Sequence, residues 1–201
     1  MKKLNVREIA LIGILGGLAA VLMMFRFPLP FMPPFMDFDF SSLPEMIGGF
    51  ALGPVAAVFI ILVKILAKLC LMGSGSMLTG ELQNVLLSMA YVLPAVFIYD
   101  RHKSKKSAEH GMLAGTKICS ITAIFTNLFI IIPFYINLYN YDMAMIIEMC
   151  TKVNPYITST TMLAILGIIP FNLIKNGVAS IVTLLLYKKI SPMMKSFIKE
   201  R

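Results

Sequence analysis

Three hydrogen-bonding side chains lie deep within stretches of the sequence that are otherwise apolar. Asn127 and Asn172 each stand about 16 Å, measured along a helix, from one end of their stretch. Lys175 follows Asn172 by about one helical turn and therefore lies on the same face. Because a polar side chain inside a membrane is costly, it indicates a functional site. For Asn127, a hydrogen bond to a neighbouring helix, worth about 1 kcal/mol, is the alternative.

A second polar group surrounds the start of the apolar stretch 82–99. Glu81 stands there in the sequence TGELQN, with Asn84 close by. A carboxylate accepts hydrogen bonds, so Glu81 matches the hydroxyl groups of a sugar-like ligand. Lys64 and Lys68 share one face of the preceding apolar stretch. We expect Lys64 to line the ligand cavity and Lys68 to extend to the outer membrane surface instead.

The side chains that catalysis or a metal site would need form no recognisable pattern. His102 and His110 flank a basic loop, and no HExxH or GxxxxGK[ST] sequence occurs. The cysteines Cys70, Cys119 and Cys150 have no metal-binding spacing. We expect them to be buried as small apolar side chains, and pairing of Cys70 with Cys150 is the alternative. The sequence therefore predicts no enzyme, no metal site and no resident cofactor.

The composition indicates that membrane helices position these residues. Of the 201 residues, 58% are hydrophobic and only 14% are charged, which excludes a soluble globular protein. Long apolar runs without strand-like alternation favour helices over a β-barrel. The net charge of +8 comes from clusters beside apolar stretches, where orientation in the membrane explains it better than nucleic-acid binding does.

The apolar stretches predict an all-α membrane protein with six transmembrane helices in one domain, residues 1–201. The second stretch is too short for a crossing of about 20 residues, and Gly53-Pro54 separates it from the third. Counting it as a separate element places the basic clusters on one side, so both termini are predicted to be cytoplasmic. A cleaved signal peptide is the less favoured interpretation of the first stretch. The stretches are 9–27, 43–52, 55–72, 82–99, 112–138 and 161–187, and the basic clusters are 2–7, 101–106 and 188–201.

Two further segments carry signals for contacts. Gly13, Gly17 and Ala20 form a strip of small residues that lets another helix approach closely, either within this chain or in a partner. The segment 25–40 combines four prolines with several phenylalanines. It therefore predicts a stiff aromatic loop that folds over a planar ligand.

With these residues in place, the sequence resembles the substrate-binding S components of energy-coupling factor (ECF) vitamin transporters, most closely the riboflavin-specific family. The resemblance covers nearly the whole chain. It implies six membrane helices with cytoplasmic termini, a location in a bacterial plasma membrane, and substrate binding without autonomous transport. The matching pieces are FPLPF, DFSSLPEMIGGFALGP, TGELQN, YVLPAVFIYDR, Asn127 with Pro133, and PFNLIKNG.

The resemblance also implies a ligand, a site and partners. Riboflavin would be the transported ligand, and the strip of Gly13, Gly17 and Ala20 would dock the transmembrane coupling subunit. Two separate ATPase subunits would supply the energy. The flavin ring matches aromatic and amide contacts, and ribityl hydroxyls match carboxylate and ammonium groups. The resemblance implies that the loop of Phe38, Asp39 and Phe40 covers the ligand. It also implies that the ligand contacts Glu81, Asn127, Asn172 and Lys175, and the positions of Lys64 and Asn84 add these two to the predicted binding residues.

The residues leave riboflavin and FMN undistinguished. An S component for another vitamin, such as pantothenate or a pterin, and a non-transport membrane scaffold are the alternative functions. A scaffold tolerates Asn172→Ala and Lys175→Ala without loss of ligand binding. A binding cavity loses affinity by an order of magnitude or more, since a good polar contact contributes about 1–3 kcal/mol.

Overall fold

A computed structural model describes residues 4–139 and 142–199, and most of them are helical. Five helical segments of this part of the chain are long and apolar enough to cross a membrane. The expectation of an all-α fold with membrane-length helices is therefore confirmed. Lys2, Lys3 and Arg201, which belong to the predicted basic clusters, lie outside the described residues. The five segments are Val6–Met24, Pro54–Met72, Thr79–His102, Lys105–Leu138 and Thr160–Tyr187.

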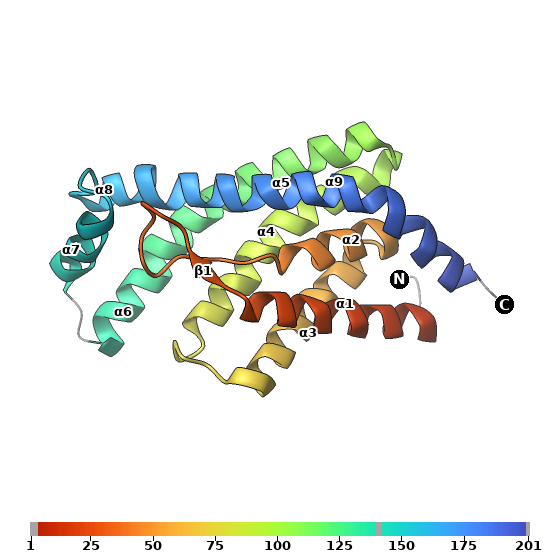
Figure 1. The fold of residues 1–201 in the computed structure, drawn as a ribbon, viewed down its shortest axis with the longest axis horizontal. Helices are drawn as coiled ribbons and strands as arrows, with labels where there is room; N and C mark the ends of the chain where they lie inside the picture. Colours follow the sequence, from red (N-terminus) through yellow and green to blue (C-terminus); the bar gives the residue numbers. More distant parts are fainter. Residues whose placement is uncertain (1–3, 140–141, 200–201) are drawn as a thin grey trace.

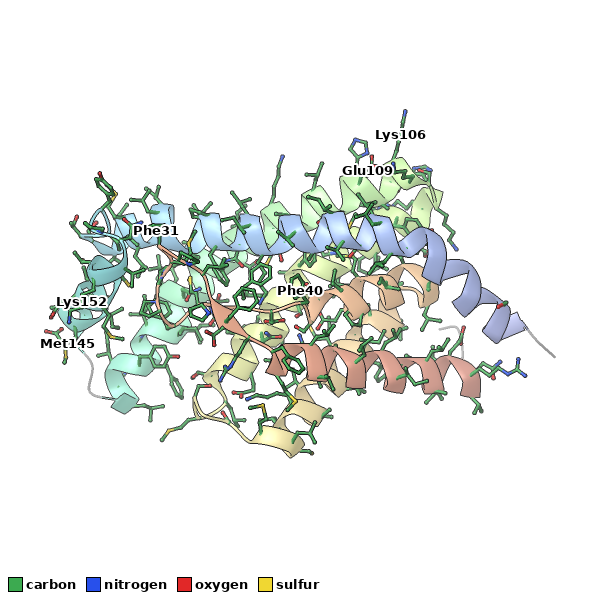
Figure 2. All side chains as sticks on the ribbon, in the orientation of Figure 1. Phe31, Phe40, Lys106, Glu109, Met145 and Lys152 are labelled. Atoms are coloured by element: carbon green, nitrogen blue, oxygen red, sulfur yellow. The ribbon has the colours of Figure 1, made fainter. Side chains whose placement is uncertain are left out.

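The long helices lie side by side in a bundle, with the turn between α4 and α5 at the same end as both termini (Figure 1). Lys106 lies at this end, whereas Met145 and Lys152 lie at the opposite end (Figure 2). The elements are α1 (Val6–Met24), α2 (Ser42–Leu52), α3 (Pro54–Met72), α4 (Thr79–His102), α5 (Lys105–Thr126), η1 (Asn127–Ile131), α6 (Ile132–Tyr139), α7 (Met143–Val153), α8 (Thr160–Met162), η2 (Leu163–Ile168) and α9 (Ile169–Lys199).

The short helix α2 ends where the sequence predicts a break. Gly53 has a φ of +96°, a conformation that glycine adopts without strain. Pro54 then occupies the first turn of α3, where its missing N–H has no intrahelical partner to lose. The sequence GFALGP therefore produces two helices in place of one long helix.

A glycine lets helices α4 and α5 pack closely, and a side-chain cap defines the start of α5. A Cβ atom at Gly111 of α5 would stand 2.6 Å from the backbone oxygen of Ala95 in α4, so only glycine fits there. Ser104 caps the start of α5 by accepting a hydrogen bond from the Ser107 N–H at 3.1 Å.

Helix α5 continues directly into η1, a π-helical turn that begins at Asn127. Such turns occur often at functional sites.

The segment between α1 and α2 contains a small hairpin that the sequence did not reveal. Strand β1 (Phe27–Pro28) pairs with β2 (Asp37–Phe38) in antiparallel register, with Phe27 opposite Phe38.

Helix α7 was also not predicted, because it lies between the apolar stretches 112–138 and 161–187, where the sequence indicated a loop. Its buried residues Ile146 and Cys150 belong to the same apolar cluster as Phe38, so the hairpin, α6, α7 and η2 share one core.

Candidate functional site

A cavity of about 350 Å³ brings together most of the polar residues that the sequence analysis selected. This volume is within the range of small-molecule sites. The hairpin segment, the start of α4, η1 and α9 all contribute to its wall. The selected residues in the wall are Asp39, Glu81, Asn84, Asn127, Asn172 and Lys175. Their role in binding stays a prediction, but their assembly in one place makes this cavity the candidate site.

An ion pair ties the hairpin segment to α9. The Lys175 ammonium lies 2.7 Å from Asp39 Oδ2, and the other oxygen of Asp39 accepts a hydrogen bond from the Ser41 N–H at 2.8 Å. Burial by itself raises the pKa of Asp39, but the charges of Lys175 and Lys64 and the hydrogen bonds from Lys175 and Ser41 lower it from 3.8 to about 2. Asp39 is therefore a carboxylate at neutral pH, with one oxygen bound to each neighbour.

A second ion pair joins α3 to the start of α4. Lys68 binds Glu81 and also donates to the Gly73 carbonyl at 2.8 Å. The second oxygen of Glu81 accepts hydrogen bonds from the hydroxyls of Ser74, at 2.9 Å, and Ser76, at 3.2 Å. Glu81 is buried yet lines the cavity, so it presents a fixed carboxylate to a ligand.

The two lysines of α3 differ from their predicted positions. Lys68 was expected to reach the membrane surface, but its side chain is only 10% exposed and lines the cavity. Lys64 was expected to line the cavity, but it is fully buried behind the wall, 2.5 Å from Glu45 Oε1 of α2. The physical reason is that each lysine pairs with a carboxylate on a neighbouring helix. Glu81 holds Lys68 in the wall and away from the membrane surface, and Glu45 holds Lys64 behind the wall.

Asn127 and Asn172 enter the cavity from opposite elements with the same amide orientation. Asn127 Nδ2 donates to the Ala123 carbonyl at 2.7 Å, and Asn172 Nδ2 donates to the Ile168 carbonyl at 2.9 Å. Each nitrogen is thus bound to its own helix. The amide oxygens of both residues are the acceptors that remain for a ligand N–H or O–H. Asn172 Oδ1 also accepts a weak hydrogen bond from the Cys119 thiol at 3.8 Å, and its second lone pair stays available.

Phe38 and Phe40 were expected to contact the ligand, but neither is in the cavity wall. Side chains alternate between the two faces of an extended segment, so Asp37 and Asp39 face the cavity while Phe38 faces the core. Phe38 and Phe40 contact each other edge to face, with ring centroids 5.1 Å apart. They support the segment that covers the cavity from behind.

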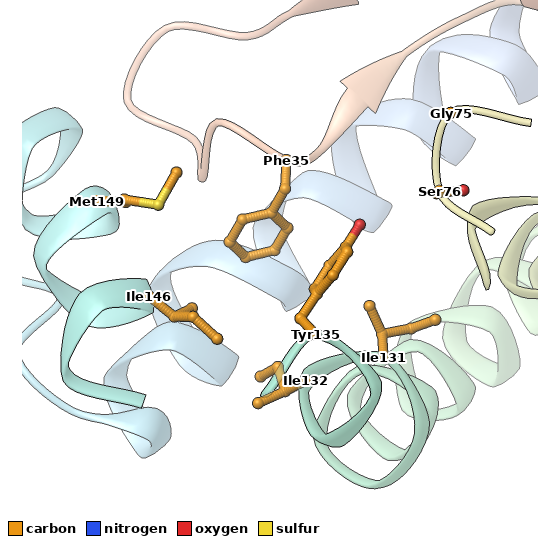
Figure 3. A pocket seen from close by; sticks show the side chains of 8 residues that line it. All are labelled: Phe35, Gly75, Ser76, Ile131, Ile132, Tyr135, Ile146 and Met149. Carbon is orange, nitrogen blue, oxygen red and sulfur yellow. The ribbon is translucent and has the colours of Figure 1, made fainter. Parts of the chain in front are cut away.

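An apolar cavity of about 270 Å³ adjoins the first one. Both cavities are lined by Phe35, Gly75, Ser76 and Tyr135, so they share one boundary. Figure 3 shows Phe35 and Tyr135 directed into the same space, with Ile146 and Met149 of α7 on its far side. The polar cavity and the apolar cavity together suit a ligand with one hydroxylated end and one flat apolar end.

The strip of small residues on α1 divides between two environments. A Cβ atom at Gly13 or at Gly17 would meet nothing within 4 Å, so these two positions face outward. Ala20 is fully buried, although helical spacing puts it near the same face. The rest of the molecule covers α1 at the level of Ala20. The outward strip therefore consists of Gly13 and Gly17, and Ala20 contributes to the interior instead.

Several residues of the site were missed by sequence reasoning. Arg26 lines the cavity and lies 3.4 Å from Asp37, which is also in the wall. Ser74 and Ser76 carried a usable signal, because their two hydroxyls stand in the short polar segment directly before Glu81. Glu45 gave a weaker signal as a carboxylate within an apolar helix. Cys119 and Cys150 are buried as expected, but the expectation of burial is wrong for Cys70, which is exposed. All three are free thiols, so Cys70 and Cys150 do not pair.

Comparison with known proteins places this geometry in a family. The family model described as "ECF transporter, substrate-specific component" matches residues 7–187. A solved structure described as "Structure and mechanism of the S component of a bacterial ECF transporter" superposes with a TM-score of 0.71. It is 30% identical in sequence and covers 96% of this chain and 98% of that chain.

Named relatives are similar over almost their whole length. Riboflavin transporter RibU of Staphylococcus aureus is 33% identical over 198 residues, covering 96% of this chain and 97% of the relative. Riboflavin transporter FmnP of Bacillus subtilis is 26% identical, covering 94% of each. Riboflavin transporter RibU of Leuconostoc mesenteroides is 28% identical, covering 96% of this chain and 95% of the relative.

Proposed function

Because the chain belongs to the family of ECF transporter substrate-specific components, we propose that it captures riboflavin at the outer side of a membrane. The observation that carries this proposal is the paired cavity, in which buried carboxylate, ammonium and amide groups adjoin an apolar space lined by Phe35 and Tyr135. The ribityl hydroxyls fit the polar part, and the isoalloxazine ring fits the apolar part. The names of the relatives support the same ligand.

The charges of the wall favour riboflavin over its phosphate ester. Three basic side chains line the polar cavity, and each is bound to a carboxylate: Arg26 to Asp37, Lys68 to Glu81 and Lys175 to Asp39. The formal charges of these six groups cancel. A phosphate would have to displace one of the bound carboxylates, whereas neutral hydroxyls add to the existing network.

The family also supports a topology and a set of partners. We propose six transmembrane helices with α2 as the short one, cytoplasmic termini, and location in a bacterial plasma membrane. Transport would depend on a transmembrane coupling subunit and two ATPase subunits, with the outward strip of Gly13 and Gly17 facing the coupling subunit. In the absence of that module, the chain binds its ligand without moving it across the membrane.

The proposal is tested by riboflavin fluorescence quenching with detergent-purified protein from which bound ligand has been removed. We expect saturable quenching, weaker binding of FMN, and no competition by pantothenate. Asn172→Ala should weaken riboflavin binding by an order of magnitude or more. Asn176→Ala is a matched control, because Asn176 is buried one turn further along α9 and does not line the cavity. Absence of quenching by the unaltered protein would refute the riboflavin assignment.

A further inference from the structure

Lys64 is a charged side chain that lies beside the polar cavity without lining it. Its ammonium contacts three groups in addition to Glu45. These contacts are Asn84 Oδ1 at 2.5 Å, Ser88 Oγ at 3.0 Å and Ser41 Oγ at 3.5 Å. Both Lys64 and Glu45 are completely buried, so neither side chain can move toward water without breaking this cluster.

The contact with Lys64 fixes which atom of Asn84 faces the ligand. An ammonium group donates hydrogen bonds and cannot accept them, so the amide oxygen of Asn84 must be the atom that points to Lys64. Asn84 also lines the cavity. Its amide nitrogen is therefore the group directed to the ligand space, where it offers N–H donors.

This orientation is opposite to that of the other two asparagines in the wall. Asn127 and Asn172 donate through nitrogen to their own helices, so their amide oxygens are the acceptors, and that of Asn172 is shared with the Cys119 thiol. The wall therefore presents a donor from α4 and acceptors from η1 and α9. Such a fixed pattern distinguishes a ligand carbonyl from a ligand N–H, and a freely rotating amide does not.

We propose that Lys64 is a positioning residue that sets the ligand specificity of the cavity by holding Asn84 as a hydrogen-bond donor. Glu45 neutralises the buried charge of Lys64, and Ser88 completes its hydrogen bonds. Lys64 thus acts on the ligand through Asn84 and does not contact the ligand itself. The inference rests on the proposed function, because riboflavin is the ligand whose carbonyl group the donor would bind.

The test is a set of riboflavin titrations in which Lys64 and Asn84 are changed singly and together. Lys64→Met alone leaves Glu45 buried without a partner and risks misfolding, so it is combined with Glu45→Leu, an exchange of a buried ion pair for apolar groups. We expect Lys64→Met/Glu45→Leu and Asn84→Ala each to weaken riboflavin binding about tenfold. The triple variant should bind within about twofold of Asn84→Ala, because the role of Lys64 is lost with its target.

Two further variants separate positioning from general support of the fold. Asn84→Asp keeps the oxygen that Lys64 binds but replaces the donor with an acceptor, so it should bind riboflavin no better than Asn84→Ala. Asn176→Ala changes a buried asparagine that neither lines the cavity nor contacts Lys64, and it should bind riboflavin within about twofold of the unaltered chain. The melting temperature of each ligand-free variant shows how much the exchange affects folding alone.

The results distinguish this inference from the proposed function. Riboflavin binding by the unaltered chain tests the proposed function by itself. Given that binding, additive losses in the triple variant, of about a hundredfold in total, would overturn the positioning role. Tight binding by Asn84→Asp, or by Lys64→Met/Glu45→Leu, would overturn it as well.

Discussion

Asp39 and Lys175 join two parts of the molecule that are far apart in the sequence. Asp39 belongs to the segment that covers the polar cavity, and Lys175 belongs to α9. The contact is almost completely buried on the Asp39 side, which is 5% exposed, so water screens it little. Loss of either charge leaves the other buried without a partner, which is more costly than loss of an exposed pair.

The lowered pKa of Asp39 predicts a specific dependence of stability on pH. The folded protein holds this carboxylate ionised down to about pH 2, whereas its ordinary pKa is 3.8. The unfolded chain therefore takes up the proton first as the pH falls. The contribution of Asp39, about 2 kcal/mol, is present above pH 3.8 and is lost as the pH falls through 2.

We expect the melting temperature of the unaltered protein in detergent to exceed that of Asp39→Asn at pH 5, and the difference to narrow between pH 4 and pH 2. Asp142→Asn is the control, because Asp142 is exposed. A difference between the unaltered protein and Asp39→Asn that stays constant over this range would contradict the assigned role of the ion pair.

Residue spacing singled out Asn127, Asn172 and Lys175, because polar groups stand out within apolar helices, and the family resemblance joined Glu81 to them. The structure places all four in the wall of one cavity. Residue spacing was not sufficient for Lys64 and Lys68. The position of a lysine depends on which carboxylate reaches it from a neighbouring helix, and spacing along one helix does not contain this information.

At the scale of elements, close contact between α4 and α5 depends on glycine at the interface. We expect Gly111→Ala to lower the free energy of unfolding by about 1–3 kcal/mol, because the added methyl group would overlap backbone atoms of Ala95. The melting temperature in detergent measures this loss. Gly13→Ala is the matched control, since its methyl group would meet nothing within 4 Å. Equal stability of the two variants would contradict the packing described for this interface.

The elements differ in how far the sequence predicts them. The break at Gly53-Pro54 was predictable, because glycine and proline have local conformational preferences that tertiary contacts rarely override. The hairpin of β1 and β2 was not, since strands of two residues carry too little periodicity. Helix α7 was missed because its residues are mixed in polarity and it lies outside the long apolar stretches.

At the scale of the whole molecule, Lys106 marks the end that holds both termini, and Lys152 and Met145 lie at the other end (Figure 2). Lys106 belongs to the basic cluster of residues 101–106. Basic loops remain on the cytoplasmic side during membrane insertion. The end with Lys106 is therefore the predicted cytoplasmic end.

Labelling of single cysteines from outside the cell tests this orientation. In a chain with Cys70→Ser, which removes the exposed native thiol, we expect Lys152→Cys to react with a membrane-impermeant maleimide on intact cells and Lys106→Cys to react only after lysis. The buried thiols of Cys119 and Cys150 should remain unlabelled in the folded protein. Labelling of Lys106→Cys on intact cells would reverse the assigned orientation.

The short length of α2 has a consequence for the route by which a ligand arrives. Helix α2 begins directly after the hairpin segment and runs toward the end of the bundle that holds the termini (Figure 1). The hairpin segment itself, which is not helical, therefore occupies the part of this crossing that α2 is too short to fill. Backbone groups without regular hydrogen bonds cannot face the hydrocarbon tails of lipids. Any displacement of this segment is thus restricted to the aqueous side, because a sideways swing would expose its peptide groups to lipid. We therefore expect the candidate site to take up solutes dissolved in water and not molecules dissolved in the bilayer.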